Sequence, residues 1–316
     1  MSVAAVLPML ILGAPAARAT YPGTNGRILF SRAHGSGFDA VYQLFSMNPD
    51  GSRVKQLTNL KDGVDIGTAT ADGTRIAFGS NGNVWVMNAD GSHRRQISST
   101  GTYFVPEWSP DGSQIAFALI KPRGSAAIGV MNADGSGAHV IARIPKTFSY
   151  LPDWSPDGTK IAFTNQSKHG YRIYTVDPHG KHLAEVPITF SPNTIEDAGI
   201  ESWSPDGTRL AFSAQPVKNG KPICDTKKGG GCDDIYIVSA AGGVPTRVTR
   251  DREEDLGPVW SADGSLLVYD HDSTPGGCVF GDTCAEDIYT IKIDGSGARR
   301  LTTAKGDEEA DWWMVG

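Results

Sequence analysis

The chain has 316 residues, of which 39% are hydrophobic and 20% charged, so it can bury a sizeable core. Its formal net charge of −6 argues against nucleic acid and anionic membranes as partners. Its 38 glycines and 19 prolines predict many turns rather than long helices.

The first 19 residues have the composition of a secretory signal peptide. The stretch VAAVLPMLILGAPAARA is apolar and small, and Ala17-Arg18-Ala19 fits the A-x-A cleavage pattern, although no Lys or Arg precedes the apolar run. We expect the mature chain to begin near Thr20, to be exported to the periplasm or the cell exterior, and to form one domain over residues 20–316. The alternative is that this stretch is a buried strand or helix of the fold.

A five-residue motif then recurs along the chain. WSPDG occupies Trp108–Gly112, Trp154–Gly158 and Trp203–Gly207, and WSADG occupies Trp260–Gly264. A fixed period of 40–50 residues is typical of propeller blades. Each unit has four short predicted strands, here called A to D, such as FVPEW, QIAFAL, IGVMN and HVIAR in the first full copy.

The motif has the chemistry of a tight turn. Proline suits the φ near −65° of a type I turn, and glycine takes the left-handed position that lets a hairpin continue. We therefore predict A–B hairpins at the pentapeptides and C–D hairpins at the NADGS-type turns, rather than calcium loops, whose full pattern is absent. The tryptophan is predicted to be an apolar wedge between neighbouring blades.

Six units are predicted from the turn glycines, because TNGRILF and TADGTRIAF are degenerate copies of the motif. These glycines are Gly26, Gly73, Gly112, Gly158, Gly207 and Gly264. The first unit lacks strand A, and Trp312 stands four residues before Gly316, as Trp260 does before Gly264. We therefore expect a strand near Ala310–Val315 to pair beside Arg27–Ser31 and close the ring, which removes exposed sheet edges.

These repeats resemble those of the TolB-like family, known for WSPDG-x-x-IAF units and six blades, over about Asn25 to Gly316. The resemblance implies an all-β fold, a six-bladed β-propeller with four antiparallel strands per blade. The sequence departs from TolB proper, which carries an α/β domain before its propeller.

The four cysteines come in two pairs, each in a long B–C loop, about Ala214–Asp234 and Asp270–Asp287. In an exported chain an even number of cysteines predicts disulfides. We expect Cys224–Cys232 and Cys278–Cys284 bonds. The alternatives are a cross-link between the two loops and a four-cysteine zinc site, although neither pair has the C-x₂-C spacing that zinc favours.

Function is expected on the face that carries the B–C and D–A connections, because loop length and composition vary there. The D–A segments entering units 5, 6 and 1 are acidic, and those entering units 3 and 4 carry aromatics. We interpret them as a binding rim around the central channel; the alternative is solvated acids and aromatics that only pack between blades. The candidate partner-binding residues are Tyr103, Phe104, Glu107, Phe148, Tyr150, Asp153, Glu253, Glu254, Asp255, Glu308, Glu309 and Asp311.

We expect a monomeric, non-catalytic module that binds a protein or a glycan of the cell envelope, with no cofactor and no metal. The sequence has no G-x-S-x-G motif and no histidine in any inferred A strand. The pair His179 and His182 lies in a predicted solvated turn. The alternative is a glycan-active, polysaccharide lyase-like enzyme with a metal or acid–base site near His271, beside Asp282 and Asp287.

Overall fold

The computed structural model describes residues 24–35, 41–64, 67–99, 102–121, 125–145, 147–167, 170–191, 195, 199–219, 221–223, 233–251, 253–272, 286–304 and 306–314. The expected signal peptide and all four cysteines lie outside these residues, so their assignments stay predictions. Within the described ranges, no helix is long and apolar enough to cross a membrane.

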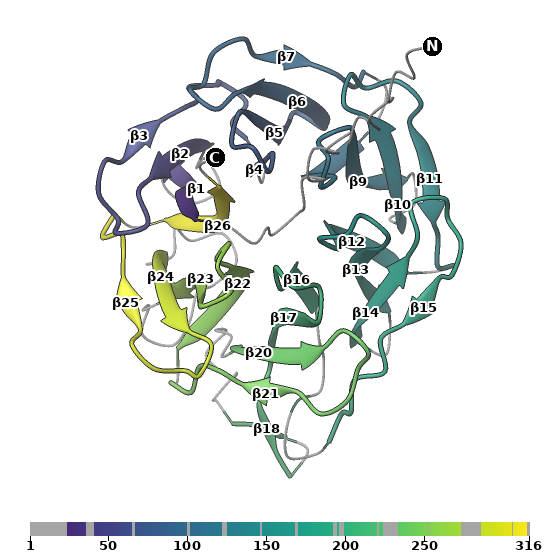
Figure 1. Cartoon of the computed structure of the whole chain (residues 1–316), viewed down its shortest axis with the longest axis vertical. Coiled ribbons are helices and arrows are strands. Elements are labelled where there is room, and N and C mark those ends of the chain that lie inside the picture. Colours follow the sequence, from purple (N-terminus) through teal and green to yellow (C-terminus); the bar gives the residue numbers. More distant parts are fainter. Residues whose placement is uncertain are drawn as a thin grey trace, which may run out of the picture.

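Six four-stranded antiparallel sheets surround a central channel, as Figure 1 shows. Each sheet is one blade, and the predicted six-bladed propeller is confirmed. From the innermost strand outward, blade 1 consists of β26 (Asp307–Met314), β1 (Asn25–His34), β2 (Val41–Met47) and β3 (Lys55–Gln56). Blade 2 consists of β4 (Gly67–Ala69), β5 (Arg75–Ser80), β6 (Asn83–Asn88) and β7 (Arg95–Gln96).

The next two blades follow the same order from the channel outward. Blade 3 consists of β8 (Thr102–Trp108), β9 (Gln114–Lys121), β10 (Ser125–Asn132) and β11 (His139–Ala142). Blade 4 consists of β12 (Phe148–Trp154), β13 (Ile161–Ser167), β14 (Gly170–Val176) and β15 (Ala184–Glu185).

Blades 5 and 6 complete the ring. Blade 5 consists of β16 (Gly199–Trp203), β17 (Arg209–Ala214), β20 (Asp234–Ser239) and β21 (Thr246–Arg247). A small hairpin of β18 (Val217–Lys218) and β19 (Lys221–Pro222) projects from its B–C connection, at the bottom of Figure 1. Blade 6 consists of β22 (Glu254–Trp260), β23 (Leu266–Asp272), β24 (Glu286–Lys292) and β25 (Arg299–Arg300).

The C-terminal strand closes the ring, as the spacing of Trp312 predicted. β26 pairs antiparallel with β1, with Ile28 opposite Trp312 and Leu29 opposite Asp311. Asn25, at the start of β1, also exchanges hydrogen bonds with Asp263 in the A–B turn of blade 6. The first and last blades are therefore joined through both backbone and side chains.

The hydrophobic core lies between the blades rather than within one central layer. Six clusters of buried side chains each combine residues of neighbouring blades. Trp108 packs between blades 2 and 3, and the Arg75 guanidinium of blade 2 lies 4.5 Å from its ring centroid. A buried indole removes about 200 Å² of surface from water, roughly 5 kcal/mol before entropic costs. The predicted wedge role of the motif tryptophan is confirmed.

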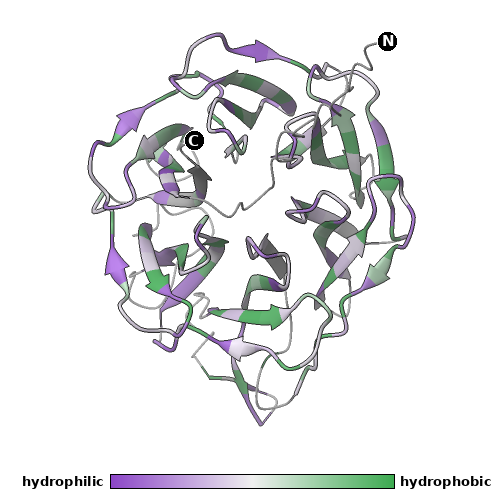
Figure 2. Cartoon of the chain, in the orientation of Figure 1, coloured by the Kyte–Doolittle hydropathy of each residue, from purple (hydrophilic) through white to green (hydrophobic). Residues whose placement is uncertain are grey.

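Three outer strands face solvent and are polar, namely β3, β7 and β25, which Figure 2 shows in purple. They are short and exposed, whereas the second strand of every blade is largely buried. These blades therefore present apolar faces to their neighbours and a polar outer edge to water.

Each pentapeptide aspartate locks its own A–B turn. Asp111 Oδ1 accepts hydrogen bonds from the Ser109 hydroxyl at 2.7 Å and from the Ser113 amide at 3.0 Å. The turn glycine takes a left-handed φ of 65° at Gly112. The pentapeptide thus recurs because serine, aspartate and glycine each satisfy one requirement of the same turn. The face formed by these A–B turns and the C–D turns is called the turn face, and the opposite face the mouth face.

Candidate functional site

One position on the innermost strands can be compared across all six blades. It directly precedes the motif tryptophan or its equivalent. Its occupants in blades 1 to 6 are Asp311, Thr68, Glu107, Asp153, Ser202 and Val259. Three of these six side chains are acidic, and we call Glu107, Asp153 and Asp311 the channel carboxylates.

The polar side chains at this position also join neighbouring blades. Asp153 of blade 4 accepts a hydrogen bond from the Trp203 amide of blade 5 at 2.6 Å. Asp311 of blade 1 accepts one from the Ala69 amide of blade 2 at 3.3 Å. The Ser202 hydroxyl donates to the Pro258 carbonyl of blade 6 at 2.9 Å. The position therefore has a structural role that a neutral hydroxyl fills as well as a carboxylate.

The negative charge of the channel carboxylates is electrostatically unfavourable. Burial, together with the Asp153 and Asp311 carboxylates, raises the pKa of Glu107 well above its usual value. Burial and the nearby Asp311 raise the pKa of Asp153 to about 8, against the lowering effect of its bond from the Trp203 amide. The acids come from blades 1, 3 and 4, so the channel charge is not restricted to the acidic blades 5, 6 and 1.

A β-bulge or register shift precedes the channel position in blades 1, 3, 4, 5 and 6. The pairing shifts between Phe104 and Glu107 in blade 3, and at the equivalent place in blades 4 and 6. In blades 3, 4 and 6 the bulge contains a residue with left-handed φ before a proline: Val105 at 49°, Leu151 at 51° and Gly257 at 59°. Because one extra residue reverses the alternation of side chains, the bulge sets which of them faces the channel.

The predicted aromatic rim residues lie on the first halves of β8 and β12, nearer the mouth face. The Tyr103 ring meets the Phe117 ring edge-on at 4.8 Å and is half-buried against the core between blades 2 and 3. Phe104 and Tyr150 are half-buried against the core between blades 3 and 4. The Phe148 side chain lies outside the described residues. The aromatics therefore contact inter-blade cores, as the packing alternative expected, and keep partly exposed surfaces.

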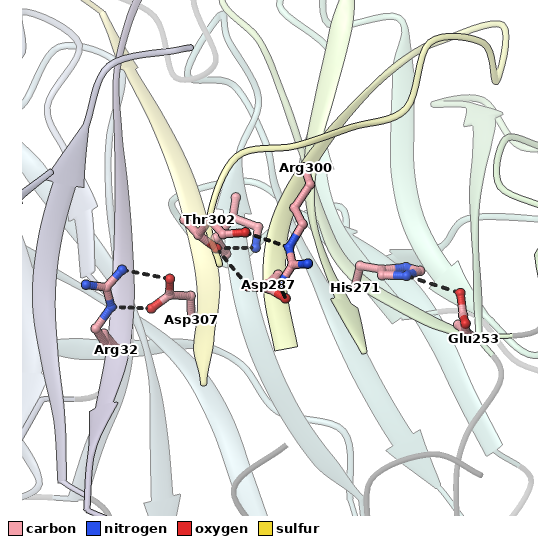
Figure 3. Close-up of polar contacts among 8 residues, drawn as sticks. Arg32, Glu253, His271, Asp287, Arg300, Thr302 and Asp307 are labelled. Carbon is pink, nitrogen blue, oxygen red and sulfur yellow. Dashed lines mark hydrogen bonds and ion pairs between the residues drawn. The ribbon is translucent and has the colours of Figure 1, made fainter. Parts of the chain in front are cut away.

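The acidic rim of blade 6 surrounds a histidine. Asp255 on β22 pairs in register with His271 on β23, and its Oδ1 lies 2.7 Å from His271 Nδ1. His271 Nε2 lies 3.2 Å from Glu253, which is half-exposed, and Figure 3 shows this contact. Both ring nitrogens therefore face carboxylates. The hydrogen bond to Asp255 raises the pKa of His271, more than burial lowers it.

The sequence analysis expected Asp282 and Asp287 beside His271, but the structure pairs His271 with Asp255. Asp282 lies outside the described residues. Asp287 stands opposite His271 on β24, but its carboxylate pairs with Arg300 and Thr302 (Figure 3). The partner, Asp255, stands across the β22–β23 hairpin. Sequence reasoning missed it because the bulge in β22 changes the register between this pair and the turn.

Three other acids of this region form ion pairs with arginines. Asp307 pairs with Arg32, Asp287 with Arg300, and Asp234 with Arg247; Figure 3 shows the first two. Of the remaining predicted site residues, Glu254 opens β22 opposite Asp272. Glu308 and Glu309 lie on β26, and their side chains are outside the described set.

Comparison with protein families gives one match of more than half the chain. Residues 22–225 match the model described as TolB beta propeller domain. A comparison with curated protein sequences gives no significant match.

Solved structures with the same architecture include TolB from Acinetobacter baumannii, with a TM-score of 0.69 and 18% identity over 91% of this chain and 66% of that one. A putative TolB from Agrobacterium tumefaciens has a TM-score of 0.65 and 17% identity, over 93% of this chain and 100% of that one. An oligogalacturonate lyase from Vibrio parahaemolyticus has a TM-score of 0.56 and 14% identity, over 91% of this chain and 78% of that one. At these identities the likeness concerns the fold alone.

Proposed function

The chain belongs to the TolB-like family of β-propellers, and from this premise we propose that it is an exported, non-catalytic module that binds a protein partner of the cell envelope. The partner docks on the mouth face, and a cationic segment of it enters the channel. A glycan that stacks on the aromatic residues is the other occupant that the experiment below tests.

The observation that carries this proposal is the mutual repulsion of the channel carboxylates. Glu107 is destabilised in its charged form by burial and by two neighbouring acids, and Asp153 by burial and by Asp311. A lysine or arginine side chain placed among them would relieve this repulsion in a site where charges are poorly screened. The site thus favours a cation over a neutral or anionic ligand.

The mouth face supports the approach of such a segment. The half-exposed Glu253 and its neighbours lie on the mouth side of blade 6. The half-buried rings of Tyr103 and Tyr150 lie on the mouth side of blades 3 and 4. Glu107 is four residues further along β8 than Tyr103, roughly 10–13 Å along an extended strand. An extended segment of a few residues would span the rim and the channel carboxylates together.

The test begins with a pull-down from envelope extract, with the chain from Thr20 onward as bait, and continues with binding kinetics of the captured partner. Glu253, Glu254, Glu308 and Glu309 changed to Gln should slow association and flatten its salt dependence, because surface charge acts on encounter. Tyr103→Ala or Tyr150→Ala should mainly speed dissociation, by on the order of 1–2 kcal/mol. Glu107→Gln should weaken binding of a lysine-containing partner peptide more than that of the same peptide with glutamine.

The turn face provides the matched control. Asn88→Ala and Asn132→Ala remove side-chain bonds to Ser92 and Ser136 in the C–D turns and should leave binding intact. If these folded variants lose binding and the rim variants do not, the partner binds the turn face and not the mouth face. A partner that binds equally well in the Glu107→Gln variant and without its basic residues would reject the cationic segment.

Export and the cysteine pairing have separate tests. N-terminal sequencing of the protein from a secreting host should give a start near Thr20. Non-reduced peptide mapping should give Cys224–Cys232 and Cys278–Cys284 bonds. Four free thiols would contradict both the pairing and the export.

A further inference from the structure

Three side chains near the mouth face of blade 6 have the spacing of metal ligands. Asp251 precedes β22, Asp255 lies on β22 and His271 lies on β23. One donor atom from each lies within 4.8 Å of the others. Two ligands held about 2.0–2.2 Å from one ion are roughly 3–4 Å apart, so a small closure of these side chains would complete the site.

A second observation on Asp255 points independently to a cation. Asp255 is fully buried, and its Oδ1 accepts the contact from His271 Nδ1. Its Oδ2 is also buried and accepts no hydrogen bond of normal geometry, although the Thr249 hydroxyl also interacts with this carboxylate. A buried carboxylate oxygen without a donor is costly, and a bound ion is one of the few ways to satisfy it.

The neighbouring acids show what this carboxylate lacks. Asp234, Asp287 and Asp307 stand on β20, β24 and β26 of blades 5, 6 and 1, and each pairs with an arginine. Asp255 has an imidazole instead, which supplies a positive charge only when it is protonated and supplies a metal ligand when it is neutral. Three acids of this region therefore pair with arginines, whereas Asp255 pairs with the His271 imidazole, a group that binds metals.

We propose that Asp251, Asp255 and His271 bind one divalent transition-metal ion of the zinc or manganese class. The mixture of carboxylate and imidazole ligands suits these ions, whereas calcium prefers oxygen ligands alone and more of them. Glu253, which is half-exposed and in contact with His271 Nε2, closes the solvent side of the site. The Glu253 amide donates to Asp251 Oδ1 at 3.2 Å and so orients that ligand.

The ion would have a structural consequence. Asp251 belongs to the connection that leaves blade 5, and His271 belongs to the second strand of blade 6. An ion shared between them ties the entry of β22 to its own hairpin and fixes the mouth-side edge of blade 6. The site is separate from the channel carboxylates and does not rest on the proposed binding function. It departs from the absence of a metal that the sequence led us to expect.

The experiment is calorimetric titration of the tag-free chain, stripped with EDTA, with Zn²⁺, Mn²⁺ and Ca²⁺. We expect one Zn²⁺ or Mn²⁺ per chain with higher affinity than Ca²⁺, and a rise in Tm at saturating metal. Asp251→Asn and His271→Gln should each lower the affinity roughly tenfold or more. Asp251 is exposed, so its variant keeps the fold even if changes at buried positions do not.

The matched control is His182→Gln, because His182 also contacts an aspartate, Asp177, at 2.9 Å, but on an exposed turn. This variant should bind the metal as the unchanged protein does. The proposal is overturned if neither Zn²⁺ nor Mn²⁺ binds, or if Asp251→Asn and His271→Gln bind them with unchanged affinity. Equal loss in the His182 variant would also overturn it.

Discussion

Asp111 and Asp153 stand on neighbouring blades but have opposite surroundings. Asp111, in an A–B turn, accepts hydrogen bonds from the Ser109 hydroxyl and from the amide and hydroxyl of Ser113. Partial burial opposes ionisation, yet these bonds hold its pKa below the usual value. Asp153, in the channel, accepts one bond from the Trp203 amide, and burial with the nearby Asp311 raises its pKa.

The contrast extends to the other acids at the two ends of the blades. The A–B turn aspartates all have lowered pKa values, despite burial, because serine or threonine side chains and turn amides donate to them; they are Asp72, Asp111, Asp157, Asp206 and Asp263. Burial raises the pKa of the acids in the channel and near the mouth; these are Glu107, Asp153, Asp234, Asp255 and Asp287. The charges of the turn face therefore stabilise the fold, whereas ionisation of the buried acids at the other end is unfavourable and is offset by an arginine at Asp234 and Asp287.

The largest expected effect comes from removing a cation that the fold already supplies. Arg247→Gln should destabilise the protein by roughly 2–4 kcal/mol, because Asp234 is buried and would lose its charged partner. Adding Asp234→Asn should restore stability to within about 1 kcal/mol of the unchanged protein. Urea denaturation of the single and double variants measures both effects.

The control for this prediction is present in the molecule. At the equivalent position of blade 1, the Thr58 hydroxyl donates to Gln43, and the Gln56 amide donates to the Thr58 carbonyl. The same geometry thus exists with neutral side chains. If the double variant is as unstable as Arg247→Gln alone, charge at this position is required by the fold, and the contrast between the two ends is weakened.

The second prediction removes an unfavourable charge and keeps its hydrogen bond. Asp153→Asn should raise stability by roughly 1–2 kcal/mol at pH 9, because the asparagine oxygen still accepts from the Trp203 amide. The folded-state pKa of about 8 lies above the unfolded value of 3.8, so the unchanged protein loses stability as pH rises between them. The denaturation midpoints of Asp153→Asn and of the unchanged protein, measured from pH 4 to pH 9, should therefore differ most at pH 9 and converge toward pH 4.

Asp153→Ala is the matched variant, since it removes the charge and the hydrogen bond together. It should be less stable than Asp153→Asn at every pH, because the Trp203 amide would lose its acceptor in a buried position. A pH-independent difference between the unchanged protein and Asp153→Asn would contradict the proposed cost of the channel charge.

The third prediction concerns an aspartate of the turn face. Here removal of the charge should lower the stability of the protein instead of raising it. Asp111→Ala should destabilise the protein by about 1 kcal/mol at pH 7, a value discounted for the exposure of the turn. The lowered pKa means that this stabilisation is present above the unfolded value of 3.8 and is lost as the pH falls through the folded value. Urea denaturation at pH 7 and in strong acid separates this loss from any pH-independent effect of the substitution.

The turns and the ring closure could be predicted from sequence because their causes are local. Serine, aspartate and glycine determine the A–B turn within five residues, and the spacing of Trp312 to Gly316 repeats that of Trp260 to Gly264. The pairing of His271 with Asp255 could not be predicted, because it depends on a bulge in β22. Asp311 meets Glu107 and Asp153 only once six blades have closed into a ring, which no local pattern encodes.

The smallest expected effect tests the bulges that direct side chains into the channel. Val105 and Leu151 have left-handed φ values that a branched side chain adopts at a cost of roughly 1–2 kcal/mol. Glycine would remove this strain but lose side-chain packing and add roughly 0.5–1 kcal/mol of backbone entropy cost. Val105→Gly should therefore change stability by less than about 1 kcal/mol, and Gly257→Ala should be the more harmful change. Its new Cβ would stand 3.1 Å from Asp270 Oδ2 at a φ of +59°. Urea denaturation of both variants shows which one loses more stability. A large loss of stability in Val105→Gly alone would show that the valine side chain, rather than the backbone, maintains the bulge.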